Sequence, residues 1–462
     1  MNTVVLAGLI GYVLVQFAIG AWVSRHISSE QDYILAGRSL GTGLVAFSVF
    51  ATWFGAEAIV ASAGEVYDRG LSGALTDPFG YGVAVVIVAL LIAAPLWRRN
   101  IVTYADMVRQ RYSPAAEKAF VLVLLPGSVF RAAAQIRAFG QIVSSSTGLD
   151  VGTAILIAAV LVAAYSVVGG LLADAITDVV QGLAVIIGLG VLVYFVASHQ
   201  GGLEAAVTKI APERLQPLAL GDDGILGKIE KMAVVIGGSI VSVELISRFL
   251  GARSVNVART GTLIGGLMYL AVGLMPVFLG LVGPALMPNL AEPEQIIPKL
   301  AEAHLPALGY ALFLGALVSA ILSVVHAALH APAAQISHNI IGRLSPGMSQ
   351  AGRLRSVRLT VLGLSLVAFL LALSVDRIKE LVEIASAFGS AGALVVALFG
   401  LFTRFGGPAS ALASLAAGIL MWMWAKYLFG LKAPYLVGLG SALAAYVIVA
   451  LIERRDDIRP RS

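Results

Sequence analysis

Residues 46–64, AFSVFATWFGAEAIVASAG, are apolar enough to lie inside a membrane-spanning helix, yet they include Glu57, Gly55 and Gly64. A carboxylate at the middle of a bilayer is energetically costly, and such residues usually serve a function. Glycine weakens a helix at points where backbone carbonyls can be released to bind a ligand. The stretch therefore predicts an interrupted membrane helix that carries a functional acid, a pattern typical of transporters.

The composition of the whole chain indicates a polytopic, all-α integral membrane protein. Of its 462 residues, 59% are hydrophobic and 12% are charged, and the mean hydropathy is +0.92. These values lie outside the range of soluble globular proteins. The chain has no cysteine, which excludes disulfides and thiolate metal sites. The net charge of +5 comes from basic residues between apolar spans, so it does not indicate a nucleic-acid partner.

Apolar windows of about twenty residues predict thirteen membrane-spanning helices in one transporter domain over residues 1–462. The first span is followed by Arg25 and has no cleavage-site pattern, so we expect it to be retained. The predicted ranges are 3–24, 40–64, 79–97, 117–144, 151–171, 173–197, 229–250, 258–286, 307–338, 355–375, 379–403, 407–429 and 433–453.

Lysine and arginine are distributed unequally between the two sets of loops. Loops on the same side as residues 25–39 hold about 19 of them, and the opposite loops hold about 8. Because cytoplasmic loops carry the excess of basic residues, the N-terminus is predicted outside and the C-terminus in the cytoplasm. The expected location is the cytoplasmic membrane.

Two large polar side chains lie at mid-depth in the predicted spans. Arg131 lies near the middle of 117–144, too deep for its charge to reach the membrane surface. It requires either an acid such as Glu57, a group of carbonyls, or the carboxylate of an anionic substrate. Trp53 lies beside the interrupted segment, where it forms either a wall over the substrate or ordinary packing. The sequence leaves these alternatives open.

Four segments, in the same order and on the corresponding helices, resemble the sodium/solute symporter family. Each is weakly specific, but together they extend over nearly the whole chain. The segments are DYILAGRSLG (32–41), AYSVVGGLLADAITDVVQG (164–182), SRFLGARS (247–254) and LSVVHAALHAPAAQISHNI (322–340).

The resemblance implies a LeuT-type fold with a five-plus-five inverted repeat, here residues 40–197 and 229–403. The spans 3–24, 407–429 and 433–453 are then peripheral. Members of this family carry small solutes such as proline, pantothenate, sugars and sialic acid. The expected function is therefore secondary active symport of a small polar or charged solute by alternating access. The resemblance favours a monomer.

The resemblance also implies a cation site built from oxygen ligands, which hard cations require. Its backbone carbonyls fall on Ala51, Phe54 and Ala320, and its first hydroxyl falls on Ser323. The adjacent second hydroxyl of the family falls on Val324, which has no side-chain oxygen. Sodium coupling is therefore doubtful on this evidence, unless another oxygen or a water completes the site.

Two histidines follow the altered position. His326 stands where many family members carry Asp or Ser, and His330 follows one turn later. Histidine titrates near neutral pH and suits proton relay. The coupling ion is therefore either Na⁺ or H⁺, and an uncoupled transporter is a further alternative.

The other acids have both functional and structural interpretations. In the family, the acid that corresponds to Asp178 lies near the ion exit route, so this residue is a gating candidate. An acid near a helix N-terminus is also favoured by the helix dipole, which is the interpretation for Asp174. Glu244 and Arg248 are four residues apart and predict a local salt bridge.

Three further residues are solute-binding candidates by resemblance. Glu57 and Ser242 fall at positions that contact or border the substrate in sugar-transporting relatives, and Ser239 lies one turn from Ser242. The alternatives are an ion pair between Glu57 and a basic residue of another span, and serine hydroxyls bonded to their own helix.

Other classes of protein find little support in the sequence. It contains no G-x-x-x-x-G-K-[ST] loop and no H-E-x-x-H motif, so neither direct use of ATP nor zinc hydrolysis is indicated, and no enzyme or cofactor is expected. The main rival is a non-transporting receptor that retains the fold. Costly polar groups inside the predicted bilayer argue against that rival.

Overall fold

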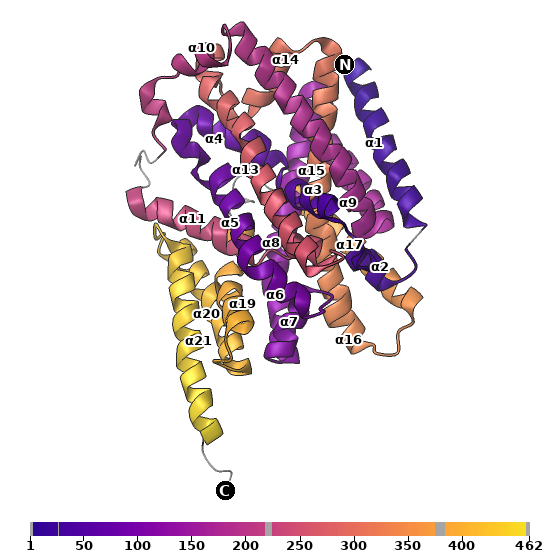
Figure 1. Ribbon diagram of the computed structural model, residues 1–462, viewed down its shortest axis with the longest axis vertical. Coiled ribbons are helices and arrows are strands. Elements are labelled where there is room, and N and C mark those ends of the chain that lie inside the picture. Colours follow the sequence, from indigo (N-terminus) through magenta and orange to yellow (C-terminus); the bar gives the residue numbers. More distant parts are fainter. Residues whose placement is uncertain (1–2, 26, 218–223, 375–383, 459–462) are drawn as a thin grey trace.

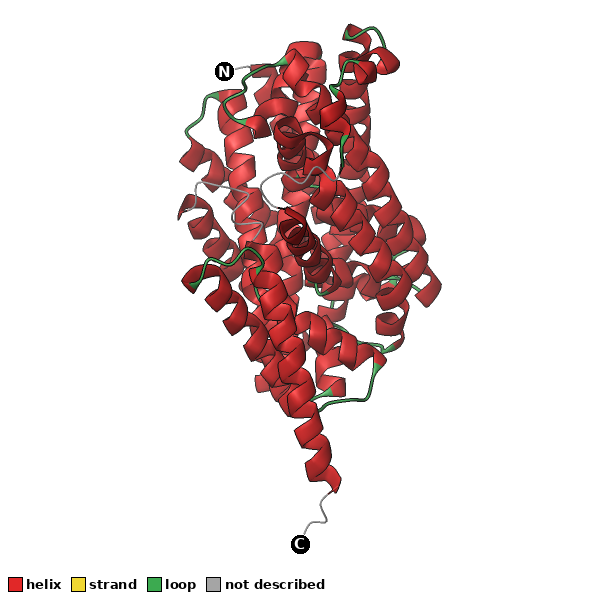
Figure 2. Ribbon diagram, turned by 90° about the vertical axis from the view of Figure 1, so that its left-hand side faces the viewer, coloured by secondary structure: helices red, strands yellow, loops and turns green. Residues whose placement is uncertain are grey.

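The computed structural model describes residues 3–25, 27–217, 224–374 and 384–458. Within these ranges the chain is helical and contains no strand, as Figure 2 shows. A single isolated backbone bridge joins Leu40 to Ala252. The all-α prediction is confirmed.

Most of the helices coincide with apolar stretches of the sequence, and short helices lie in the connections between them (Figure 1). Their bounds are α1 Thr3–Ser24, α2 Glu30–Leu35, α3 Thr42–Trp53, α4 Ser62–Arg69, α5 Tyr81–Ile87, α6 Ala93–Arg98, α7 Tyr104–Arg111, α8 Pro114–Thr147, α9 Val151–His199, α10 Leu203–Thr208, α11 Gly224–Ile240, α12 Val243–Leu250, α13 Val255–Leu286, α14 Ile296–His304, α15 Ala307–Gln335, α16 Gly342–Leu344, α17 Gln350–Ser374, α19 Ser390–Phe402, α20 Pro408–Met423 and α21 Pro434–Ile458.

Ten helical stretches in the described ranges are long and apolar enough to cross a membrane. The predicted span 40–64 is interrupted, because α3 ends at Trp53 and a wide π-helical turn begins at Glu57. The predicted spans 151–171 and 173–197 are one helix, α9, divided at Gly170. Gly170 has φ 59° and ψ −177°, a conformation that a residue with a side chain rarely adopts.

The predicted start of the eleventh span, residues 379–383, lies outside the described residues. The remainder of that span is helical over Ile384–Phe402, apart from a turn that precedes α19. The number of membrane crossings therefore depends on how interrupted and continuous helices are counted.

Burial separates a central group of helices from a peripheral group. The stretch Ala307–Leu344 contains α15, and 89% of its apolar 18-residue window is buried. In the stretch Pro434–Glu453 of α21, 28% of the corresponding window is buried. Helix α15 packs against α8, α9 and α1. Figure 1 shows α1 along one edge of the molecule, and α20 and α21 on another side. These positions agree with the predicted peripheral spans.

Candidate functional site

The interrupted segment after α3 releases backbone groups at the centre of the helix bundle. The amide of Gly55 donates to the Trp53 carbonyl at 3.0 Å instead of to Ala51. The next amide, of Ala56, donates to the side-chain oxygen of Gln135 on α8 at 3.1 Å. Because the Gly55 amide bonds elsewhere, the carbonyl of Ala51 loses its usual partner in the helix, and the Ala56 amide leaves the carbonyl of Thr52 in the same way. The break therefore frees an oxygen in a buried place.

A second break separates α11 from α12. Ser242 has the extended conformation of a helix N-cap, with φ −63° and ψ 119°, and its hydroxyl accepts from the Leu245 amide at 3.4 Å. The same hydroxyl donates to Glu244 at 2.6 Å. Ser239 is buried on α11, and its hydroxyl has no hydrogen-bond partner in the described part of the chain. Ser242 thus caps a helix, which matches its structural interpretation.

The residues proposed for cation binding lie on α3 and α15, which are in contact. Ala51, Ala320 and Ser323 are all buried, as is Phe54 at the break. Val324 points at the break, because a Cβ built on Gly55 would lie 2.7 Å from its Cγ2. Val324 therefore lies beside the interrupted segment.

A buried carboxylate lies next to Ser323. Asp178 on α9 accepts a hydrogen bond from Ser48 on α3 at 2.6 Å through Oδ2. Its Oδ1 accepts from the Ser323 hydroxyl on α15. Asp178 and Ser48 are completely shielded from solvent, and Ser323 nearly so. The three side chains join α3, α9 and α15 at one buried point where a carboxyl group and two hydroxyls meet, and such oxygens are the ligands that hard cations prefer.

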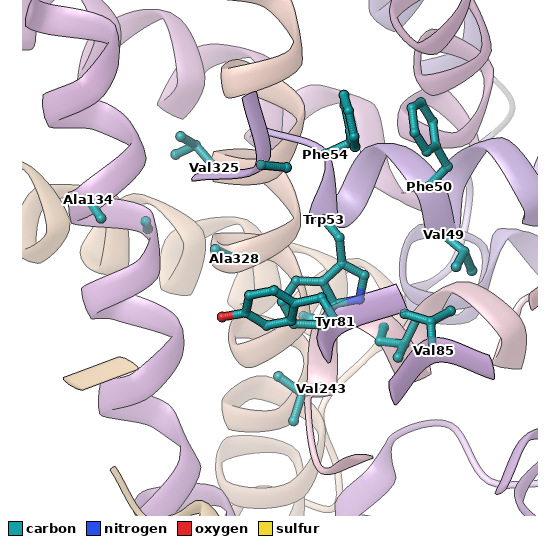
Figure 3. Packing of buried hydrophobic residues seen from close by; sticks show 14 of the residues in the cluster. Val49, Phe50, Trp53, Phe54, Tyr81, Val85, Ala134, Val243, Val325 and Ala328 are labelled. Atoms are coloured by element: carbon teal, nitrogen blue, oxygen red, sulfur yellow. The ribbon is translucent and has the colours of Figure 1, made fainter. Parts of the chain in front are cut away.

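Four side chains, Trp53, Glu57, Tyr81 and Arg131, form what we call the floor cluster. Figure 3 shows Trp53 and Tyr81 lying over one another, with ring centroids 5.4 Å apart. The Arg131 guanidinium lies 4.5 Å from the Trp53 ring centre and 3.5 Å from Glu57 Oε2. The Tyr81 hydroxyl donates to Glu57 Oε1 at 2.8 Å. Arg131 therefore pairs with Glu57, one of the partners expected from sequence.

The floor cluster borders a cavity of about 1330 Å³. Glu57 and Tyr81 line this cavity, together with parts of α4, α11 and α14. Figure 1 places α4 and α14 at one end of the molecule, away from α7 and α16. A small separate cavity of about 30 Å³ is lined by Arg131, Ser242 and Glu244. Arg131 and Ser386, 3.3 Å apart, stand between the two spaces.

His326 belongs to a second buried polar group, separate from the residues proposed to bind the cation. Its Nδ1 lies 2.9 Å from Asp174, and Asp174 also forms an ion pair with Arg248. Arg248 Nε donates to the Thr52 hydroxyl at 2.8 Å. His326 stacks on His330, with ring centroids 5.3 Å apart. These contacts tie α3, α9, α12 and α15 together.

Two sequence interpretations of this group are wrong. Arg248 bonds to Asp174 and Thr52, so the predicted local pair with Glu244 is not present among the described contacts. Asp174 lies in the first turn after α9 is divided at Gly170, as predicted, but no described backbone amide donates to its carboxylate, which pairs with Arg248, so it does not cap the helix. Neighbours four apart on one helix predict a contact only when no partner from another helix competes, and here one does.

Sequence reasoning missed Ser48, Tyr81 and Asp77. Ser48 is an ordinary small residue of a membrane helix, and Tyr81 begins the next span, so neither position carries a signal of its own. Asp77 precedes Pro78 in what reads as a loop, where an acid needs no explanation. In the structure it is buried and lines the large cavity.

Replacement of Gly55 with alanine is expected to disrupt the break. The new Cβ would lie 2.7 Å from Val324 Cγ2 and 2.9 Å from Gln135 Oε1, so the segment must shift. Overpacking of this kind costs about 1–3 kcal/mol. Thermal unfolding and ligand binding of the purified variant measure the effect.

Gly43→Ala is the matched control. Gly43 also lies on α3, and a Cβ at this position would have no neighbouring atom within 4 Å. Alanine at an exposed helix position should stabilise by up to about 1 kcal/mol. Equal behaviour of the two variants would show that the close approach at Gly55 is unimportant.

Comparison with known proteins places these features in context. The model of the sodium:solute symporter family matches residues 33–418. A high-affinity choline transporter of Caenorhabditis elegans is 24% identical over 413 residues, which cover 81% of this chain and 71% of that protein. The sodium/pantothenate symporter of Escherichia coli is 26% identical over 363 residues, covering 76% and 75%. The human high affinity choline transporter is 24% identical, covering 72% and 61%.

The chain thus spans between 61% and 71% of the length of these two choline transporters. Among solved structures, a Na⁺-coupled sialic acid symporter in a substrate-bound, outward-open state superposes with a TM-score of 0.88 at 18% identity, over 97% of each chain. A nucleobase-cation-symport-1 family transporter superposes with a TM-score of 0.64 at 14% identity, over 92% of this chain and 95% of the other. These likenesses establish the LeuT-type fold.

Proposed function

Because this chain belongs to the sodium:solute symporter family, we propose that it couples the inward movement of Na⁺ to uptake of a small polar or charged solute. The family and the relatives are transporters, not enzymes. Transport occurs by alternating access. Solute reaches the floor cluster through the 1330 Å³ cavity, and rearrangement of the broken helices then opens a path to the opposite side of the membrane.

The main support for sodium coupling is the position of the Asp178 carboxylate. It bonds to Ser323, the remaining hydroxyl of the family's cation site, and to Ser48 on the helix that ends at the break. We propose that Na⁺ binds near Ser323, with the carbonyls of Ala51, Phe54 and Ala320. Asp178 then supplies negative charge and an oxygen that offset the loss at Val324.

The contacts of His326 support a structural role in place of proton coupling. Its ring is held between Asp174 and His330 and touches Tyr165, with a centroid distance of 5.1 Å. Asp174 is already paired with the buried guanidinium of Arg248. His326 thus completes a packed polar group that fixes α15 against α9.

The floor cluster is the proposed solute site. Glu57 and Tyr81 line the cavity, Arg131 pairs with Glu57, and the Trp53 ring stacks on Tyr81. Ser239 and Ser242 lie by the second break; Ser242 lines the small cavity beyond Arg131. We propose that solute reaches these serines only after the Arg131–Glu57 pair separates.

The remaining proposals concern arrangement in the membrane. We propose a monomer in the cytoplasmic membrane, with inverted repeats over 40–197 and 229–403. The N-terminus is outside and the C-terminus inside. Figure 1 shows the start of α1 and the end of α21 at opposite ends of the molecule, which supports this arrangement. The large cavity then opens to the outside.

Replacement of Val324 with threonine tests the proposed ion site. Valine and threonine have nearly the same shape, so the variant adds one oxygen beside the break, and a bound cation would satisfy this buried hydroxyl. We expect sodium to bind about tenfold more tightly, which corresponds to about 1.4 kcal/mol. A sodium titration of the melting temperature, with potassium as control, measures the shift.

Val325→Thr is the matched control, since Val325 is buried one position further along α15, turned away by about 100°. Unchanged sodium affinity in Val324→Thr, or an equal gain in Val325→Thr, would contradict the placement of the ion.

A further inference from the structure

The floor of the large cavity carries a second acid that the symport scheme above does not use. Asp77 is 5% exposed and lines the cavity. Its Oδ1 accepts from the Tyr269 hydroxyl on α13 at 2.8 Å, and its backbone carbonyl accepts from Ser62 at 2.9 Å. Its Oδ2 is buried and has no hydrogen-bond partner in the described part of the chain. A buried carboxylate oxygen without a partner is costly.

The charges around Asp77 leave it without a cation. No lysine, arginine or histidine of the described ranges lies within 4.0 Å of its carboxylate, whereas Glu57 nearby has Arg131 at 3.5 Å. Glu57 and Asp77 are close enough for their charges to interact. With Arg131 offsetting Glu57, an ionised Asp77 gives the floor about one negative charge, which a monovalent cation would neutralise.

The remainder of the cavity has the same sign. Apart from Glu57 and Asp77, six acidic residues and three lysines line it. An excess of one charge in a cleft with low-dielectric walls raises the local concentration of ligands with the opposite charge. The cavity therefore favours entry of cations over anions.

Resting on the proposed transport function, we propose that Asp77 binds the ammonium group of the transported solute, with an N–H donating to Oδ2. An ammonium group needs one well-placed acceptor and tolerates a wide cavity on its other side. Sodium needs several oxygens close together. At Asp77, the carbonyl oxygen and Oδ1 each already accept one hydrogen bond, from Ser62 and Tyr269. The vacant Oδ2 therefore suits an organic ammonium better than a bare ion.

The test uses thermal unfolding of the full-length purified protein with matched solutes, in sodium. The panel pairs primary ammonium solutes of increasing size with their hydroxyl counterparts, such as ethanolamine with ethylene glycol and glycinamide with glycolamide, and includes pantothenate as an anion. A solute that binds the native state raises its melting temperature. We expect stabilisation by one or more ammonium solutes and by none of the hydroxyl counterparts.

Asp77→Asn is expected to weaken that ammonium solute at least tenfold, while stabilisation by sodium alone stays unchanged. Tyr269→Phe removes the neighbouring hydroxyl but keeps the charge, so it should still bind the solute. Asp150→Asn, at the exposed N-cap of α9, is the matched control.

The proposal is overturned if no ammonium solute stabilises the protein, or if Asp77→Asn binds one as tightly as the unmodified protein. Loss of sodium stabilisation in Asp77→Asn would also overturn it, by assigning the carboxylate to the ion. Absence of any sodium effect in the unmodified protein would instead count against the proposed coupling.

Discussion

Replacement of Asp178 with asparagine is expected to abolish sodium-driven uptake. The amide has the shape of the carboxylate and can still bond to Ser48 and Ser323, so the helices should remain in place. What is lost is a buried negative charge beside the proposed ion. At an effective dielectric constant of about 20, a unit charge about 4 Å away contributes about 4 kcal/mol. Sodium affinity should therefore fall by at least about 100-fold, or about 2.8 kcal/mol.

Two measurements on Asp178→Asn separate ion binding from folding. The melting temperature without sodium should change little, and its increase on addition of sodium should disappear. Asp150→Asn makes the same chemical change at an exposed cap, where asparagine serves as well as aspartate. Retention of full sodium stabilisation in Asp178→Asn would remove Asp178 from the ion site.

Glu57→Gln is expected to have the second large effect, on the solute and not on the ion. The variant leaves the buried guanidinium of Arg131 without the carboxylate that lies 3.5 Å away. Breaking a buried pair by removing one partner costs about 3 kcal/mol or more. Solute uptake should fall at least about 100-fold, equivalent to about 2.8 kcal/mol, while sodium still stabilises the protein.

A double variant distinguishes lost function from lost stability. Glu57→Gln combined with Arg131→Met removes both charges, so the melting temperature should recover while uptake does not. Glu204→Gln, exposed on α10, is the control for the single change. If the double variant transported solute normally, the Arg131–Glu57 pair would be structural only.

The helix break and its acid were predictable because they are local features. Glu57 between Gly55 and Gly64 interrupts an apolar stretch, and the structure ends α3 at Trp53, four residues before Glu57. The place of Val324 beside the break followed from the resemblance to a family. Physical chemistry alone gives no means of aligning residue 324 with residue 55.

The partners of the buried charges were not predictable. Asp174, Arg248 and His326 come from three helices, and only the packing of α9, α12 and α15 brings them together. Asp77 looks like a loop residue in the sequence, and its burial depends on Tyr269, 192 positions away. Long-range pairing of polar groups in a membrane bundle leaves no periodic signal in the sequence.

Sodium-dependent thermal stabilisation of the purified protein tests the central claim most directly. The melting temperature should be compared in sodium, potassium and rubidium chloride at pH 6 and pH 8. Because a ligand present at 100 times its Kd stabilises the native state by about 2.7 kcal/mol, sodium alone should raise the melting temperature clearly, at both pH values. Equal melting temperatures in all three salts, with a shift only between pH 6 and pH 8, would contradict sodium coupling.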